Sequence, residues 1–293
     1  MYKIGIIGSE NSHAMAFARI FNGLEADVSY PDIKVVGIGG HYPEESEKVF
    51  RECGLDFVAD KPEDMLGRVD AVMVTSRNGL FHPGFARPFI EAGLPAFIDK
   101  PFANDAEEAR ALAQLAKDKG VPLAGGSSVK YAWDVQLLKH ARETAQAGAV
   151  FGGEAAAPLN MHNEYGGFYF YASHLAEMSL TIFGYDPLSV SAFLQGDNVA
   201  AVVRYDRYLV ANRFHNGNYN YSATLYGEKR TLFREVDISL IYRHECENFA
   251  HMLRTGQMDQ SYEELILPVY YLNAVERAWT TGVEQKIERP ALA

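Results

Sequence analysis

The ten residues from Gly5 to Ala14, GIIGSENSHA, are of a type that could hold the phosphates of a dinucleotide. They follow a short apolar run and could turn from a strand into a helix, where a dinucleotide-binding domain usually carries a G-x-G-x-x-G loop. If Gly8 is the first glycine, the second position is Glu10 and the third is His13. A carboxylate about 4 Å from a phosphate costs roughly 1–4 kcal/mol. We therefore expect either that Glu10 points away from the phosphates or that the loop is shorter than usual; in both cases the helix N-terminus still favours an anion.

A second group of polar residues lies in PLNMHNEYGG, residues 158–167, and in the helix predicted after it. Asn160 and His162 are candidates for a sugar pocket, although the same segment could form a solvated turn. Imidazole and carboxylate groups also suit zinc or manganese, and four such residues lie here: His162, Glu164, His174 and Glu177. Because their spacing follows no metal-binding pattern, we expect no metal site.

The elements that position these residues change character along the chain. Apolar runs and amphipathic stretches alternate over the first ~125 residues, as in βαβ units on a parallel sheet. The predicted strands are 2–7, 34–38, 71–74, 96–98 and 122–124, and the predicted helices are 12–24, 44–53, 82–92 and 105–119. Asn104, with Glu107 three residues later, is predicted to cap the last of these helices.

After Gly126 the pattern becomes a helix at 131–147, a strand near 153–160, a helix near 171–183, several strands between 188 and 237, and two closing helices at 240–255 and 262–281. Consecutive strands separated by turn signals predict an α+β unit with an open antiparallel sheet. We therefore place a domain boundary between residues 124 and 125. The tyrosines of the strand region are predicted to pack a face between subunits; they are residues 205, 208, 219, 221 and 226.

Composition limits the classes of protein that this chain can represent. The formal charge of −11 argues against nucleic acid as a partner, because phosphate backbones need a basic surface. No run approaches the ~18 apolar residues that indicate a membrane span. The two cysteines, Cys53 and Cys246, are far apart and have no metal-type spacing, which suits a cytoplasmic protein.

The segment from Phe97 to Gly126, FIDKPFANDAEEARALAQLAKDKGVPLAGG, resembles the Gfo/Idh/MocA oxidoreductases, the family of glucose–fructose oxidoreductase and inositol dehydrogenase. Their Glu-Lys-Pro motif at the end of a strand corresponds here to Asp99-Lys100-Pro101. The segment from Gly166 to Gly184, GGFYFYASHLAEMSLTIFG, is similar to the family's substrate-side helix, with His174 at the position of its histidine. Individually weaker similarities extend over nearly the whole chain.

The resemblance implies a Rossmann-like N-terminal domain over residues 1–124 and an α+β domain for substrate binding and oligomerisation over residues 125–293. It implies hydride transfer between NAD or NADP and a sugar, cyclitol or related polyol. Lys100 and His174 become the catalytic candidates, and Tyr171 and Glu177 join Asn160 and His162 as candidates for substrate binding. The cofactor candidates are Gly8, Ser9, Glu10, Asn11, Ser12, His13, Thr75, Asn78, His82, Asp99, Lys100 and Pro101. A homodimer or homotetramer through the C-terminal sheet is the expected assembly.

Two further positions depart from the family's pattern. The second strand ends in Gly39, Gly40 and His41, where NAD enzymes usually place an acid for the ribose hydroxyls. Phe170 occupies the position of an aspartate that belongs to the proton-transfer set of sugar-oxidising members. Two alternatives therefore stay open: a non-catalytic sensor of a nucleotide or sugar on the same scaffold, and a metal-assisted sugar lyase or hydrolase.

Overall fold

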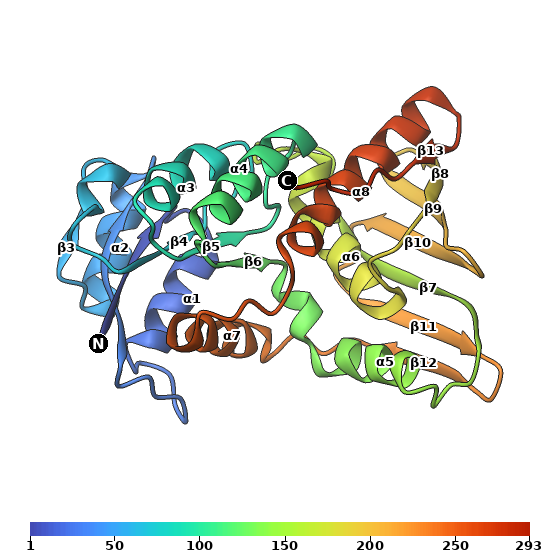
Figure 1. Ribbon diagram of the computed structural model, residues 1–293, viewed down its shortest axis with the longest axis horizontal. Helices are drawn as coiled ribbons and strands as arrows, with labels where there is room; N and C mark the ends of the chain where they lie inside the picture. The colour runs from blue at the N-terminus through green and yellow to red at the C-terminus, as the bar shows by residue number, and fades with distance from the viewer.

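Alternating strands and helices in the first part of the chain build a six-stranded parallel sheet in the order β3-β2-β1-β4-β5-β6. The computed structural model describes all 293 residues (Figure 1). The strands are β1 Tyr2–Ile7, β2 Ile33–Gly39, β3 Phe57–Val58, β4 Ala71–Val74, β5 Ala96–Asp99 and β6 Leu123–Gly126. The helices are α1 Ser12–Phe21, α2 Pro43–Cys53, α3 His82–Glu91 and α4 Ala106–Lys119. The predicted parallel α/β sheet is confirmed, and the short β3 is an addition to it.

The predicted cap of α4 was wrong by one residue. Asp105, not Asn104, is the N-cap, and its Oδ1 accepts from the backbone N–H groups of Glu107 at 2.9 Å and Glu108 at 3.0 Å. The carboxylate one position closer to the helix reaches both free N–H groups of the first turn. Asn104 instead lies among the loops beside the site, where its carbonyl accepts from Asn273 Nδ2 at 2.9 Å.

The later strands form a seven-stranded sheet in the order β12-β11-β7-β10-β9-β8-β13. Its strands are β7 Val150–Leu159, β8 Ser189–Gln195, β9 Asn198–Arg204, β10 Leu209–Asn216, β11 Ser222–Gly227, β12 Thr231–Glu235 and β13 Gln285–Lys286. All pairs are antiparallel except β7 with β10. The second sheet is thus mixed, whereas an antiparallel sheet was expected. The chain enters the meander β8-β9-β10 through a helix, and the last strand of the meander, β10, lies parallel to β7.

Helices cover one face of this second sheet and leave the other face open (Figure 1). The covering helices are α5 Trp133–Glu143, α6 Phe168–Phe183 and α8 Tyr262–Thr281, and each contacts the strands. The burial of β9 alternates strictly, as expected for a sheet with one solvated face. The remaining helix, α7 Ile241–Thr255, returns to the first sheet and contacts α1 and β6. A division of the chain at residues 124 and 125 stays a prediction.

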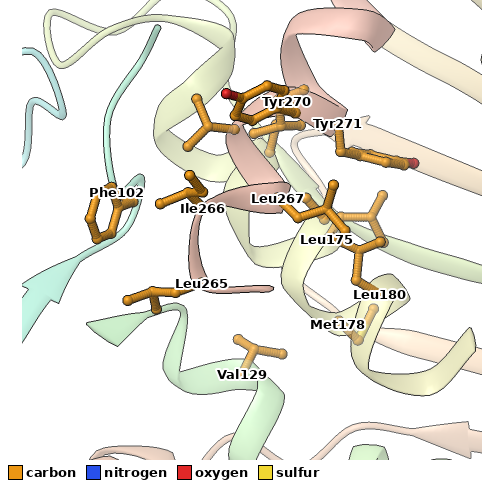
Figure 2. Close-up of a cluster of buried hydrophobic side chains, with 14 of the residues drawn as sticks. Phe102, Val129, Leu175, Met178, Leu180, Leu265, Ile266, Leu267, Tyr270 and Tyr271 are labelled. Carbon is orange, nitrogen blue, oxygen red and sulfur yellow. The ribbon is translucent and has the colours of Figure 1, made fainter. Parts of the chain in front are cut away.

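A continuous apolar core connects the two sheets (Figure 2). Phe102 from the loop after β5, Leu175 and Met178 from α6, and Leu267 and Tyr271 from α8 all belong to it. Burial of such side chains is worth roughly 1.5–3 kcal/mol each. This packing fixes α6 against the loop that follows β5, and so fixes the two elements that carry His174 and Lys100.

Candidate active site and cofactor groove

Asp99 ends β5 as a fully buried carboxylate that is held by the start of α1. Its Oδ2 accepts from Asn11 Nδ2 at 3.0 Å and lies 2.6 Å from His13 Nδ1, and its Oδ1 accepts from the backbone N–H of Lys100 at 2.7 Å. Burial alone would raise the pKa of Asp99, but the facing His13 and the charge of Lys100 outweigh it and lower the pKa to about 2. Asp99 is therefore an ionised anchor between the first loop and the lysine.

Lys100 follows Asp99 and is only 3% exposed. No acceptor forms a hydrogen bond or ion pair with its Nζ; the nearest described partner is the ring of Phe170, whose centre lies 4.2 Å away. Burial lowers the pKa of Lys100, the charge of Asp99 opposes this effect, and the charge of Arg77 adds to it. An amine with a lowered pKa that faces a cavity is suited to proton transfer near neutral pH.

His174 lies on the inner face of α6 and meets the chain that leaves β6. Its Nδ1 is 2.7 Å from Ser127 Oγ, which in turn accepts from the backbone N–H of Val129 at 3.2 Å. Ser127 and His174 share this hydrogen bond through Nδ1, which leaves Nε2 as the ring nitrogen that can face the cavity. Burial, followed by the charge of Lys100, lowers the pKa of His174 well below its usual value. The ring is thus neutral at pH 7.

These residues surround a cavity of about 270 Å³ between the two sheets. Its lining comes from α1 and the loop before it, the loops after β4, β5 and β6, α6, the segment after β10, and α7. The lining residues are Asn11, Ser12, His13, Arg77, Lys100, Ser128, Val129, Pro158, Phe170, Tyr171, His174, Tyr219, Tyr221, Ile238, Ile241 and Tyr242. No aspartate or glutamate is among them.

A larger groove of about 680 Å³ adjoins this cavity and shares Asn11, Ser12 and Arg77 with it. It runs along the start of α1 and past α2, and Ser9 and Glu10 also line it. The loop that forms its floor needs a glycine at position 8: φ is +101°, and an added Cβ would lie 2.2 Å from Ser76 N.

Glu10 points away from the start of α1, as the first of our two alternatives for this loop required. Its Oε1 accepts from Ser76 Oγ at 2.8 Å and from the backbone N–H of Arg77 at 2.9 Å, both in the loop after β4. Helix α1 begins behind Asn11, whose side chain accepts from His13 N. The groove therefore combines a tight glycine turn, a free helix N-terminus and a redirected carboxylate, and these residues fit a dinucleotide pyrophosphate.

Three of the predicted cofactor residues support the groove from behind. The Thr75 hydroxyl donates to the carbonyl of Gly8 at 2.6 Å. Both ring nitrogens of the fully buried His82 are 2.7 Å from backbone carbonyls, those of Pro101 and Ser76. Asn78 caps its own turn by accepting from Leu80 N at 3.1 Å. These contacts fix the loops after β4 and β5 and leave none of these side chains in the groove lining.

Three of the predicted substrate residues lie outside the cavity lining. Asn160 accepts from the backbone N–H of His162, and the exposed His162 ring pairs with Asp197 at 2.9 Å. Glu177 is buried and pairs with Lys130 at 3.3 Å. Tyr171 alone of the four lines the cavity.

The four residues considered for a metal site do not converge, because His162, His174 and Glu177 each have a different partner. No group of three or more histidine, cysteine, aspartate or glutamate side chains in the chain is arranged to hold a metal ion.

Several residues of the site were missed from sequence. Arg77 lies between Thr75 and Asn78 in the loop after β4, and Ser127 follows β6; both come directly after parallel strands, where ligands bind in such sheets. Tyr219 and Tyr221 line the cavity, and their packing at a face between subunits stays a prediction. They precede β11 at the edge of the second sheet that faces the first, which periodicity does not reveal.

The fold and site define a class of protein in which a parallel dinucleotide-binding sheet and an open-faced sheet enclose a cavity beside a buried lysine. Residues 2–127 match the family model described as Gfo/Idh/MocA, an oxidoreductase family with an NAD-binding Rossmann fold. Residues 2–127 thus match the NAD-binding part of this oxidoreductase family.

Relatives of known structure share the whole fold. The scyllo-inositol dehydrogenase of Lactobacillus casei, solved with bound NAD(H) and scyllo-inositol, has a TM-score of 0.84 at 15% identity, covering 98% of this chain and 99% of that one. A myo-inositol dehydrogenase from Corynebacterium glutamicum has a TM-score of 0.84 at 17% identity, with 98% and 99% coverage.

In sequence, the myo-inositol dehydrogenase Hyg17 of Streptomyces leeuwenhoekii is 35% identical over 82 residues. This match covers 28% of this chain and 25% of that relative. No helix of the chain has the length and apolar character that crossing a membrane requires.

Proposed function

We propose that this protein is an NAD-dependent dehydrogenase that acts on a sugar, cyclitol or related hydroxylated small molecule. The observation that carries the proposal is the position of Lys100: its buried ammonium has no polar partner and faces a cavity of about 270 Å³ that opens into the groove at the start of α1. The known activities of the inositol dehydrogenases with this fold agree with that assignment.

Ser9, Asn11 and Ser12 would hold the pyrophosphate of the cofactor at the start of α1, with Arg77 at the boundary between groove and cavity. The dinucleotide supplies the hydride acceptor or donor when it is bound. No acid follows β2, so the ribose of the cofactor would lack the usual carboxylate there. His41 occupies this position and packs against Phe81 and Phe85, with ring centres 4.6 and 4.9 Å away.

The chain's own chemistry is the movement of a proton at the substrate oxygen. Lys100 is placed to hold that proton, because its lowered pKa makes the amine a usable base and its ammonium a usable donor. His174 presents Nε2 to the same cavity and is oriented by Ser127. The Phe170 ring covers Lys100 and excludes water from it, which strengthens the electrostatic interactions in the cavity.

The uncovered face of the second sheet is the surface through which we propose that copies of this chain assemble into a homodimer or homotetramer. Phe193, Val202, Leu209, Tyr226 and Phe233 are exposed large apolar or aromatic side chains on its strands. An apolar surface of this kind on a sheet is typical of an interface. Light scattering at micromolar protein tests the proposal, and a monomeric mass would contradict it.

The dehydrogenase proposal is tested by calorimetric titration of the purified protein with NAD, NADH, NADP and NADPH, followed by a rate assay on a panel of cyclitols and sugars. We expect binding of at least one oxidised and reduced pair and turnover with that pair. Lack of binding by all four would overturn the proposal. Binding without turnover on any hydroxylated substrate would favour a sensor on this scaffold.

A further inference from the structure

The cavity beside Lys100 has an unusual balance of charge. Two of its lining side chains, Lys100 and Arg77, are cationic, and none is a carboxylate. From this we propose that the substrate is a hydroxylated ring that carries an oxyanion, the carboxylate of a sugar acid or the phosphate of a sugar phosphate, and not a neutral cyclitol. This inference rests on the proposed dehydrogenase function and names the substrate class of the same site.

Both cationic side chains of the lining lack an acidic partner. Neither Lys100 nor Arg77 forms an ion pair, whereas the nearby Lys130 pairs with Glu177 at 3.3 Å. The Arg77 guanidinium lies over the Tyr165 ring, 4.8 Å from its centre, so a stacking contact holds it while its N–H edge stays available. Lys100 is 3% exposed, and a buried charge without a partner is costly unless a ligand provides one.

The acids that come close to the cavity, Asp99, Glu10 and Glu245, do not line it. Asp99 contacts Asn11, His13 and the backbone of Lys100, and it does not line the cavity. Glu10 accepts from Ser76 and from the backbone of Arg77 on the groove side. An anion entering the cavity therefore meets two cationic side chains without ion-pair partners and no lining carboxylate that would repel it.

The hydrogen-bonding groups of the lining also disfavour a neutral polyol. Each hydroxyl of such a substrate needs an acceptor when it is buried, and the strong side-chain acceptors of proteins are carboxylates. In this cavity Asn11 Oδ1 already accepts from His13 N. The lining hydroxyls can each donate or accept, and no lining group is a charged acceptor; they belong to Ser12, Ser128, Tyr171, Tyr219, Tyr221 and Tyr242. With Lys100 and Arg77 as charged donors, the lining suits an oxyanion better than a ring with only hydroxyl groups.

Size and shape favour a single ring. A cavity of about 270 Å³ is smaller than the ~300–1,000 Å³ of pockets that hold drug-sized ligands. Phe170, Tyr171, Tyr221 and Tyr242 give it aromatic walls against which the apolar face of a sugar ring can pack.

The test uses the full-length protein in a two-step calorimetric titration. NADH is added first, and the NADH complex is then titrated with D-glucuronate, D-glucose 6-phosphate or D-glucose, which differ only at the sixth carbon. We expect glucuronate or the phosphate to bind at least ~10-fold more tightly than glucose, because a charge-assisted hydrogen bond is worth ~1.5–3 kcal/mol. The two acids distinguish carboxylate from phosphate as the source of the oxyanion.

The variants Arg77→Met and Arg77→Lys test whether the guanidinium of Arg77 causes the preference for the acid. In the NADH complex, Arg77→Met is expected to reduce the preference for the acid by at least ~10-fold. Arg77→Lys is expected to restore part of the preference, because it returns the charge without the two parallel N–H donors of a guanidinium. The matched control is Arg87→Met, which removes the same charge from the exposed surface of α3. It should leave both binding steps unchanged.

The outcomes separate the two proposals. Failure of NADH to bind in the first step would overturn the dehydrogenase function itself. Binding of NADH followed by equal binding of glucose and the two acids, or by no binding of either acid, would overturn the oxyanion class alone. If Arg77→Met weakened only the NADH step and left the acid preference intact, the assignment of Arg77 to the substrate would be wrong.

Discussion

The Nζ atom of Lys100 lies 4.2 Å from the centre of the Phe170 ring. A cation over an aromatic face is stabilised by about 0.5–2 kcal/mol, but the ring accepts no proton and offers no hydrogen bond to a hydroxyl. The contact therefore keeps the ammonium in the cavity without neutralising it. The site thus keeps the lysine. It differs from the site of the polyol dehydrogenases that the chain resembles, in which an aspartate is expected at the position of Phe170.

Phe170→Asp should make the site more like that of an enzyme for neutral polyols. The new carboxylate would face Lys100, raise its pKa and repel an anionic substrate. We expect the acid-to-neutral binding ratio to fall by at least ~10-fold, since one buried opposing charge is worth more than ~1.4 kcal/mol. Phe170→Leu is the control for lost packing, and an equal fall in that variant would contradict the electrostatic explanation.

Lys100→Met removes the donor and its charge but keeps length and apolar packing. Because the lysine would act on an oxygen whose charge develops during reaction, we expect turnover to fall by at least ~10²-fold with little change in cofactor affinity. Rates and calorimetry on the same preparation measure both. Full turnover in the variant, on an identified substrate, would show that the family's mechanism does not apply here.

His174 is neutral at pH 7, since burial and the charge of Lys100 lower its pKa well below the usual 6.5. The pH profile of turnover should therefore show no ionisation near pH 6.5, and any acid limb should lie lower. His174→Asn should cost less turnover than Lys100→Met if the ring is only a donor. A loss equal to that of Lys100→Met would indicate that the two residues act as one relay.

Asp99→Asn tests the anchor beneath the lysine. The pKa of Asp99 is lowered from 3.8 to about 2, so the carboxylate contributes about 2–3 kcal/mol of stability that is present above pH 3.8 and lost as the pH falls through about 2. The variant should be less stable by that amount in denaturant at pH 7, with the gap closing towards pH 2. Asp56→Asn, at an exposed pair with Lys34, should cost less than ~1 kcal/mol.

Glu245 on α7 is a buried acid, 1% exposed, and neither carboxylate oxygen has a hydrogen-bond partner. Burial, followed by the charge of Asp99, raises its pKa well above 4.5. Its contribution to stability is therefore fully present below pH 4.5 and lost as the pH rises towards the raised pKa. Glu245→Gln should have a higher Tm than the parent at pH 7 and an equal Tm near pH 4. The exposed Glu247→Gln should change neither value, and an unchanged Tm in Glu245→Gln at pH 7 would show that the carboxyl has a partner in solution.

The sequence alone determined the elements and the position of the motif lysine. Short apolar runs alternate with amphipathic stretches, and this pattern predicted the parallel sheet. Each strand of such a sheet is buried on both faces between helices and is therefore apolar throughout. Asp99-Lys100-Pro101 directly after a buried run placed Lys100 at the carboxyl edge of that sheet. Such signals are local: each depends on residues within one turn or one strand, and a sequence shows them directly.

Tertiary structure decided what surrounds Lys100. Arg77 comes from the loop after β4, Phe170 and His174 from α6, and Tyr221 from the segment after β10. Only the packing of α6 and α8 on the loop after β5 brings them to one cavity. The same packing left His162 in solvent with Asp197. Which way a side chain points between the two sheets depends on long-range contacts between elements. Local periodicity carries no information about those contacts.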